Sequence, residues 1–419
     1  MHRRISLDQL EFAEHVQPGD VIAWPQGPGE PLALTEALVR QRATLNSVSV
    51  MAGLIDSKTL QPEWADHLSF VALNGGGGTR RITALAEIIP SHISTIPALI
   101  RSGALRVDVA LIHVRPLPEG GYTVGVICDF TQAMIQKART VLALINESLP
   151  LMRHDAVVAA GDIDILIDGD DRIIDSPNPV PSPAEEAVAA HVAALIPDRA
   201  TIQLGVGTLP AAVAAALRNH KDLGVHSDVV FDVLVDLVER GVITNAYKGR
   251  DAEMTVTGGL LGTRLLRDFA ERSGLVTMRN AEYTHHLSVA GTIRNLHTIN
   301  AALEIDLSGQ VNSEVAGGRY LGAVGGQVDF GRAGNAAPDG HSIFAFASTT
   351  PDGKQSRIVA SLGDRPVTTP RSDVDVVITE FGACHLRGCS LRERARRLVG
   401  IAHPDHRETL LRAISSAKP

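Results

Sequence analysis

The hydrophobic pattern alternates between two kinds of segment along most of the chain. Short, continuous apolar runs, such as Val107–Val114 and Ala200–Gly207, are flanked by glycine or proline and predict buried strands of a parallel sheet. Longer segments with apolar residues three and four apart, such as 132–146, 209–220 and 229–241, predict amphipathic helices. This strand–helix alternation is typical of open sheets flanked by helices. The predicted fold class is therefore α/β.

A proline-rich segment divides the chain. Residues 173–187 carry four prolines within seven residues (Pro177, Pro179, Pro181, Pro183), which favours a stiff, extended spacer over a helix or a central strand. A chain of 419 residues is also too long for one ordinary core. We predict an N-terminal α/β domain over residues 1–175, a linker over 176–187 and a C-terminal α/β domain over 188–419.

Composition and charge exclude several classes of protein. A net charge of −8 and a pI near 6.0 argue against a nucleic-acid partner bound through its phosphates. Three cysteines are too few for a disulfide framework and fit a reducing compartment. We find no apolar run of about 18 residues and no signal-peptide pattern at the N-terminus. We therefore predict a cytoplasmic protein with no membrane partner.

Candidate chemistry lies in loops of the second half. Ligands of open α/β sheets bind beyond the carboxyl ends of the strands. The segment Gln203–Pro210 lies at such a position, because it joins a predicted strand to a predicted helix. Gly205 and Gly207 allow close backbone approach, and the next helix offers N–H donors to an anion or oxyanion. Pro210 breaks the dinucleotide pattern G-x-G-x-x-G. An ordinary tight turn is the alternative explanation.

Each of two further loops has both a structural and a functional explanation. In the stretch His226–Asp228, Ser227 or Asp228 could cap a helix that begins near Val229, which local sequence favours, or Asp228 could be a catalytic carboxylate. In Arg319–Phe330, glycines precede a strand-like run and could present N–H groups to a carbonyl oxygen or mark a crowded crossing. The 16 histidines include no H-E-x-x-H spacing, and we assign no metal.

Several longer stretches carry a family resemblance. They are ATIQLGVGTLPAAV, KDLGVHSD, DLVERGVITN, NSEVAGGRYLGAVGGQVDF and VDVVITEFGACHLRGCSLRERARRLVGIAHPDHR, together with DVALIHVRPLPEGGYTVGV in the first half. In collinear order over nearly the whole chain, they resemble the acetyl-CoA hydrolase/transferase family, which includes 4-hydroxybutyrate and acetate-type CoA-transferases. Such a set is far more specific than any single glycine motif.

The resemblance implies an architecture and a chemistry. The fold would be two similar open parallel-sheet α/β domains of the CoA-transferase type, with the active site in the cleft between them. Acyl-CoA and a small carboxylate would be the substrates, with coenzyme A as substrate and product and no permanently bound cofactor. A carboxylate of the enzyme becomes covalent in this family, and preorganised N–H groups stabilise each oxyanion. Because members of the family commonly dimerise, we expect a homodimer.

The resemblance also assigns roles to residues. Asp228 stands at the position of the nucleophile, and four glycines, Gly205, Gly207, Gly325 and Gly326, are expected to be backbone donors or contacts of CoA. Gln327 is expected near the acyl group and Lys354 near the CoA phosphates.

The chain departs from the family at two of these positions. The family pattern is His, Ser or Thr, then Glu, so Asp228 is one methylene short, and Phe231 replaces a small serine. A shorter carboxylate has about 1.5 Å less reach, which leaves room for a water molecule. Three hypotheses follow: a transferase with Asp228 as nucleophile, a hydrolase in which Asp228 activates water, and a non-catalytic protein that binds CoA esters. The intact glycine loops argue against the third.

Overall fold

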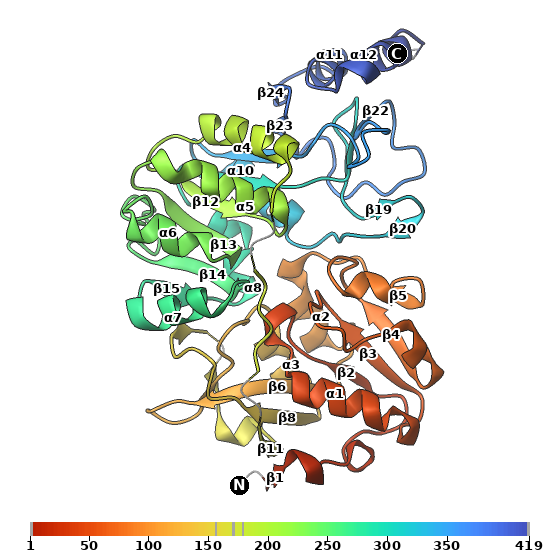
Figure 1. The fold of residues 1–419 in the computed structure, drawn as a ribbon, viewed down its shortest axis with the longest axis vertical. Coiled ribbons are helices and arrows are strands. Elements are labelled where there is room, and N and C mark those ends of the chain that lie inside the picture. The colour runs from red at the N-terminus through yellow and green to blue at the C-terminus, as the bar shows by residue number, and fades with distance from the viewer. Residues whose placement is uncertain (1–2, 156, 170–171, 178–179, 417–419) are drawn as a thin grey trace. The chain divides into compact units, whose positions relative to one another are not determined.

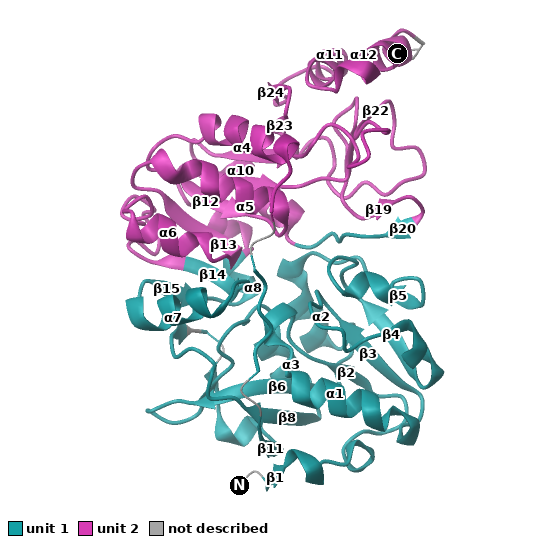
Figure 2. Cartoon of the chain, viewed as in Figure 1, with its two compact units in different colours: residues 1–177, 256–284, 319–325 teal, residues 178–255, 285–318, 326–419 magenta. Residues whose placement is uncertain are grey.

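The chain folds into two compact units. The structure is a computed structural model that describes residues 3–155, 157–169, 172–177 and 180–416 (Figure 1). Unit 1 comprises residues 1–177, 256–284 and 319–325, and unit 2 comprises residues 178–255, 285–318 and 326–419 (Figure 2). The units are thus interleaved in sequence, and the predicted domain limits at 175 and 188 stay a prediction.

The predicted linker, 176–187, is only partly extended. Residues 178–179, and with them Pro179, lie outside the described residues. Helix α4 (Pro183–Leu195) begins inside the predicted linker, because Ser182 accepts the N–H of Glu185 and Pro183 occupies the first helical position. A proline is tolerated there, since the first turn of a helix needs no internal N–H donor.

Unit 1 contains an eight-strand path in which every neighbouring pair is parallel. In spatial order the strands are β1 (Arg3–Ser6), β11 (Ile165–Asp168), β8 (Thr140–Ile145), β6 (Val109–Pro116), β2 (Val21–Ala23), β3 (Val48–Ala52), β4 (Leu68–Ala72) and β5 (Ala86–Ile88). The predicted strand at 107–114 corresponds to β6, whose first six residues are buried. Helices α1 (Leu32–Gln41), α2 (Ile96–Ser102) and α3 (Thr131–Lys137) belong to the same unit.

The helix predicted over residues 132–146 is wrong in its second part. Helix α3 ends at Lys137, Ala138 leaves the helical conformation, and Thr140–Ile145 is strand β8. Residues 141–144 are all buried. A segment that is apolar on both faces suits the centre of a parallel sheet, which overrode the weak helical spacing.

Unit 2 holds six neighbouring strands in the order β24-β23-β21-β16-β12-β13. Their bounds are β24 (Gly382–His385), β23 (Val376–Thr379), β21 (His341–Ala345), β16 (Leu296–Asn300), β12 (Thr201–Leu204) and β13 (Gly224–Val230). The strands from β23 to β13 are parallel, and β24 is antiparallel at the edge. The helices of this unit include α5 (Thr208–Ala216), α6 (Val233–Glu239), α10 (Gln327–Ala336), α11 (Leu391–Gly400) and α12 (Pro404–Ser416).

Two element predictions in unit 2 are wrong, and both concern the candidate site. Strand β13 continues to Val230 and α6 begins only at Val233, because the β-branched pair Val229–Val230 extends the strand. The run after Gly326 is helix α10 and not a strand. Its buried positions include Val328, Phe330 and Ala333, a helical spacing that the glycines obscured in the sequence.

The predicted α/β fold class with open, mainly parallel sheets is confirmed. Among the described residues, no helix combines the length and the apolar character that crossing a membrane requires.

Candidate active site

Asp228 lies inside strand β13 and does not cap a helix. The residue that precedes α6 is Asp232, whose side chain makes no capping hydrogen bond, so the capping explanation for Ser227 and Asp228 is wrong. The Ser227 hydroxyl instead donates to the carbonyl of Leu204 (3.0 Å) and accepts the N–H of the same residue (3.2 Å). These bonds tie β13 to the last residue of β12. Asp228 therefore stands on a rigid strand, just beyond the carboxyl end of its neighbour.

A histidine lies against the Asp228 carboxyl group. His285 Nε2 is 3.7 Å from Asp228 Oδ1, and the His285 side chain is fully buried while that of Asp228 is 22% exposed. The imidazole packs on the ring of Phe330 in α10, with ring centroids 4.6 Å apart. Three separate segments of unit 2 thus meet at this point: β13, the residues that precede α9 (Leu287–Ala290), and the first turn of α10.

The protonation states of the two groups are both displaced. Burial, with a smaller contribution from the negative charge of Asp329, raises the pKa of Asp228 to about 7. Burial lowers the pKa of His285 to about 4, although Asp329 opposes this shift. At pH 7 the imidazole is therefore neutral, and Asp228 is present in both its protonated and its ionised form. Displaced pKa values of this size are common at catalytic sites.

Gly205 and Gly207 differ in their backbone conformation and hydrogen bonding. Gly207 precedes α5 with φ 127°, a backbone conformation that favours glycine, and no side chain caps this helix. The N–H of Gly205 donates to the carbonyl of Ile299 at 3.0 Å. The Gly205 N–H is thus engaged in the sheet, and a role of Gly205 or Gly207 as an oxyanion donor stays a prediction.

The two glycines before α10 belong to different units. Gly325 is in unit 1, where it adopts φ +54° and its carbonyl accepts the N–H of Ile93 (3.1 Å). Gly326 is in unit 2, and a Cβ atom added to it would lie 2.5 Å from His285 Nε2. Gly326 is therefore required by the packing of the imidazole.

Comparison with known proteins identifies the family of this chain. Residues 3–176 match the acetyl-CoA hydrolase/transferase N-terminal domain, and residues 262–414 match the C-terminal domain of the same name. The chain belongs to the acetyl-CoA hydrolase/transferase family. Asp228 lies between the two matched segments. The membership predicted from the sequence motifs is confirmed.

Individual members of the acetyl-CoA hydrolase/transferase family are similar over nearly the whole chain. The 4-hydroxybutyrate coenzyme A transferase of Clostridium kluyveri is 35% identical over 396 residues, which cover 93% of this chain and 92% of that protein. The 4-hydroxybutyrate CoA-transferase structure from Porphyromonas gingivalis has a TM-score of 0.84 at 31% identity, covering 99% and 97% of the two chains. RipA from Yersinia pestis superposes with a TM-score of 0.90 at 29% identity and the same coverage. The chain is thus an enzyme of acyl-CoA chemistry, in a family of CoA-transferases and acyl-CoA hydrolases.

Gln327, predicted near the acyl group, already uses its amide within unit 2. Its Nε2 donates to the carbonyl of Ala301 (2.7 Å), and its Oε1 accepts from the hydroxyls of Ser313 (3.0 Å) and Thr369 (2.9 Å). Gln327 therefore holds two loops at the start of α10. A contact with an acyl group stays a prediction, and it would compete with these bonds.

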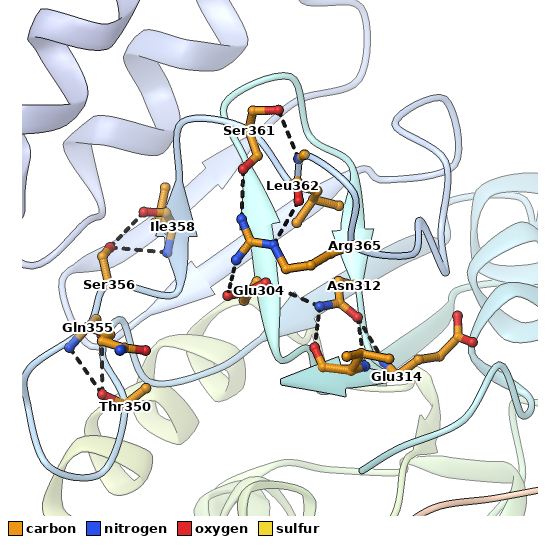
Figure 3. A network of polar contacts seen from close by, with 12 residues as sticks. Glu304, Asn312, Glu314, Thr350, Gln355, Ser356, Ile358, Ser361, Leu362 and Arg365 are labelled. Atoms are coloured by element: carbon orange, nitrogen blue, oxygen red, sulfur yellow. Dashed lines mark hydrogen bonds and ion pairs between the residues drawn. The ribbon is translucent and has the colours of Figure 1, made fainter. Parts of the chain in front are cut away.

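Lys354, predicted near the CoA phosphates, is exposed at the tip of a short loop. The loop is closed by Thr350 and Gln355, which exchange hydrogen bonds (Figure 3). The Lys354 N–H donates to Asp352 Oδ1 at 3.2 Å. The ammonium group is thus carried on a hydrogen-bonded loop, and a contact with the CoA phosphates stays a prediction.

Phe231, which replaces the small serine of the family pattern, is a core residue. It is buried and lines an apolar cavity of about 20 Å³ together with Val229, Leu234 and Leu237. Ser227, Val229 and Val230 of β13 also line this cavity. The cavity is of the order of one water molecule in size and is too small for an acyl group. Phe231 is therefore part of the core between β13, α5 and α6.

Sequence reasoning missed two groupings. His285 and Asp329 belong to no known sequence motif. The adjacent pair His285–His286 is visible in the sequence, but it does not have the spacing of metal ligands. Among the described residues, one group could also hold a metal ion: ligand atoms of His341, Asp375 and His385 lie within 4.8 Å of one another. Arg387 lies 3.1 Å from the carboxylate of Asp375 and already balances its charge, so the residues do not select a cation.

Proposed function

We propose that this enzyme is a CoA-transferase that moves CoA between a short acyl-CoA and a carboxylate acceptor, with Asp228 as the covalent carboxylate. One observation carries the proposal: Asp228 stands on strand β13, just beyond the carboxyl end of the neighbouring strand β12, and burial raises its pKa to about 7. A poorly solvated carboxylate is more basic, and hence more nucleophilic, than an ordinary aspartate. A substantial ionised fraction is still present at neutral pH.

The proposed reaction consists of balanced carboxylate exchanges. The Asp228 carboxylate attacks the thioester carbonyl and expels CoA thiolate, which leaves an acyl–aspartyl anhydride. The thiolate attacks the aspartyl carbonyl, releases the acyl carboxylate and forms an aspartyl–CoA thioester. The acceptor carboxylate then attacks this thioester and expels CoA thiolate, which leaves a second acyl–aspartyl anhydride. The thiolate attacks the acyl carbonyl of that anhydride, so the new acyl-CoA forms and the Asp228 carboxylate is released. Donors at Gly207 and the start of α5 would stabilise the oxyanions. Coenzyme A enters and leaves as a substrate, and Lys354 supplies a cation for its phosphates.

A hydrolase is the second candidate, and the same carboxyl group supports it. A general base works best with a pKa near the working pH, as Asp228 has. Its side chain is also one methylene shorter than the glutamate of the family pattern. In this case Asp228 takes a proton from water, the water oxygen attacks the thioester carbonyl, and the proton passes to the departing thiolate.

Acceptor dependence tests the transferase. The enzyme is incubated with a short acyl-CoA, with and without acetate, while free thiol and new acyl-CoA are measured. We expect acyl exchange only with acetate, and a CoA-sized mass adduct on the peptide that contains Asp228. Equal thiol release with and without acetate, with no adduct, contradicts the transferase and supports the hydrolase. Failure to act on any member of a broad acyl-CoA panel supports a CoA-ester-binding protein.

An oxygen label separates the two uses of Asp228. In ¹⁸O-water, a general base delivers the label to the free acid and leaves Asp228 unlabelled. Water that attacks an aspartyl–CoA thioester places ¹⁸O in the Asp228 carboxylate, where peptide mass spectrometry finds a 2 Da increase. Label in Asp228 after repeated turnovers therefore demonstrates the covalent path even where hydrolysis competes with transfer.

We also propose that the enzyme is a homodimer in the cytoplasm, following the family resemblance and the small number of cysteines. Sedimentation velocity at assay concentrations tests the assembly. A single species at the mass of one 44.5 kDa chain contradicts it.

A further inference from the structure

The imidazole of His285 has a specific relation to the Asp228 carboxyl group. His285 Nε2 faces Asp228 Oδ1 at 3.7 Å, slightly beyond a hydrogen bond, and the His285 side chain is fully buried. The two residues come from elements 57 positions apart in the chain, β13 and the segment that directly follows α8 (Ala281–Thr284). A buried imidazole placed beside a half-buried carboxyl group can fix the orientation of that carboxyl.

The surroundings prevent the imidazole from moving away. On one side its ring packs on Phe330 at 4.6 Å between centroids, with a 48° tilt. On another side the backbone of Gly326 approaches so closely that a Cβ there would lie 2.5 Å from Nε2. The first turn of α10 therefore forms a seat for the ring. A side chain at position 326 would collide with the imidazole, which explains the glycine at this position without any role in oxyanion stabilisation.

The titratable groups around Asp228 determine what His285 can do. Within unit 2 they are His285 itself and Asp329 in the first turn of α10, while His226 lies on β13 two residues before Asp228. Burial lowers the pKa of His285 to about 4, so the ring stays neutral in the working range. A neutral ring can donate from Nε2 to an ionised carboxylate. It does not form the ion pair that would make the carboxylate less nucleophilic.

We propose that His285 is a positioning residue for Asp228: its Nε2 holds Oδ1 and leaves Oδ2 directed to the acyl-CoA carbonyl. This inference rests on the proposed function, in which one carboxylate oxygen reacts while the other stays a spectator. When the thioester binds, a contraction of under 1 Å turns the present 3.7 Å approach into a hydrogen bond. The same contact keeps Oδ1 oriented while the aspartyl group is covalent.

The test compares His285→Leu with His285→Asn and a matched control, His297→Leu. His297 is also buried in unit 2, and burial also lowers its pKa to about 4, but it lies in β16 and contacts His341. We expect His285→Leu to lower kcat/KM at pH 7 about 30-fold, chiefly in kcat, because a misplacement of about 1 Å costs on the order of 100-fold. His285→Asn keeps an N–H donor and should recover most of that loss. His297→Leu should stay within about twofold of the parent.

The pH profile gives a readout that a purely structural effect would not move. In the enzyme–substrate complex, where the hydrogen bond is made, loss of this donor to the ionised carboxylate raises the pKa of Asp228, so the acidic limb of kcat should move up by about one pH unit in His285→Leu only. An unmoved limb, or equal losses in His285→Leu and His297→Leu, overturns the proposal. Asp228→Ala separates this failure from failure of the proposed function: an active Asp228→Ala enzyme rejects Asp228 itself, whereas an inactive one beside an unaffected His285→Leu rejects only the role of His285.

Discussion

Among the aspartate–histidine pairs of unit 2, two have additional neighbours of opposite charge. In one, Asp375 Oδ2 lies 2.7 Å from His341 Nδ1 and 3.1 Å from Arg387, with 3% of the aspartate side chain exposed. In the other, Asp228 Oδ1 lies 3.7 Å from His285 Nε2, and the additional charged neighbour is the carboxylate of Asp329. Asp375 precedes β23, at the amino ends of the parallel strands, and Asp228 lies near the carboxyl end of β13.

The sign of the third charge separates the two pairs. Asp375 pairs with the guanidinium of Arg387 as well as with His341, so that pair is a closed structural network. A second carboxylate near Asp228 adds to the effect of burial, and together they raise the pKa of Asp228 to about 7. We therefore expect the first pair to contribute to stability and the second to retain the reactivity that a catalytic group needs. The predictions below test this difference in order of decreasing expected effect.

The largest effect should come from replacing each aspartate by asparagine and comparing activity. Asp228→Asn removes the carboxylate that reacts in the proposed mechanism, so we expect kcat to fall on the order of 10³-fold or more. Asp375→Asn should leave kcat within about threefold, because Asp375 lies at the other ends of the strands. Steady-state assays with a short acyl-CoA and acetate measure both. Comparable losses in the two variants would contradict the contrast between the pairs.

The same two variants should change stability in opposite directions. Asp375→Asn leaves the Arg387 and His341 donors without their carboxylate and should lower the free energy of unfolding by about 2 kcal/mol. A raised pKa in the folded state means that stability falls as pH rises from about 4 to about 7, where Asp228 ionises only at a cost. At pH 8, Asp228→Asn removes that cost and should raise the free energy of unfolding by about 1–3 kcal/mol. Urea unfolding at pH 8 gives both values, and equal signs would refute the assignment.

Lengthening the side chain tests whether reach decides between transfer and hydrolysis. Asp228→Glu extends the carboxylate by about 1.5 Å and removes the space available to a water molecule. We expect the ratio of acyl transfer to thiol release to rise about tenfold, within the range that misplacements of about 1 Å produce. Parallel assays of new acyl-CoA and free thiol give the ratio. An unchanged ratio would show that side-chain length does not control access of water.

The smallest effect should follow from the neighbouring charge. Asp329→Asn removes the negative charge that helps to raise the pKa of Asp228, so that pKa should fall while burial still holds it above 3.8. The reactive form is the ionised one, which is present above the pKa and lost below it. Activity at pH 6 should therefore rise about threefold relative to the parent, with little change at pH 8. A pH–rate profile checks this; an acidic limb that moves upward would contradict it.

Much of the fold and the family was accessible from the sequence. Short apolar runs predicted β6 and β12 because buried parallel strands are apolar on both faces. The collinear motifs predicted the acetyl-CoA hydrolase/transferase family, which the domain matches confirm. Local rules failed where tertiary context decides. Val229 and Val230 extend β13 through Asp228, although the same residues also fit the start of an amphipathic helix.

The arrangement around Asp228 could not be predicted from sequence spacing. The His285 ring, which lies beside Asp228, packs against Phe330 in α10 and against Gly326, which precedes α10. Likewise, the Gly205 N–H is used by Ile299 through the pairing of β12 with β16, which no loop motif reveals. Such contacts depend on which strands become neighbours, so they appear only when the sheet is assembled.

The remaining exposed fifth of the Asp228 side chain has a thermodynamic consequence. Any ligand that covers it completes the removal of water and raises the pKa of the carboxyl group further. Because that pKa is already about 7, binding near neutral pH then draws a fraction of a proton from the buffer. The apparent heat of binding of a CoA ester should therefore differ between buffers in proportion to their ionisation enthalpies. The slope of that dependence gives the number of protons that Asp228 takes up for each CoA ester bound.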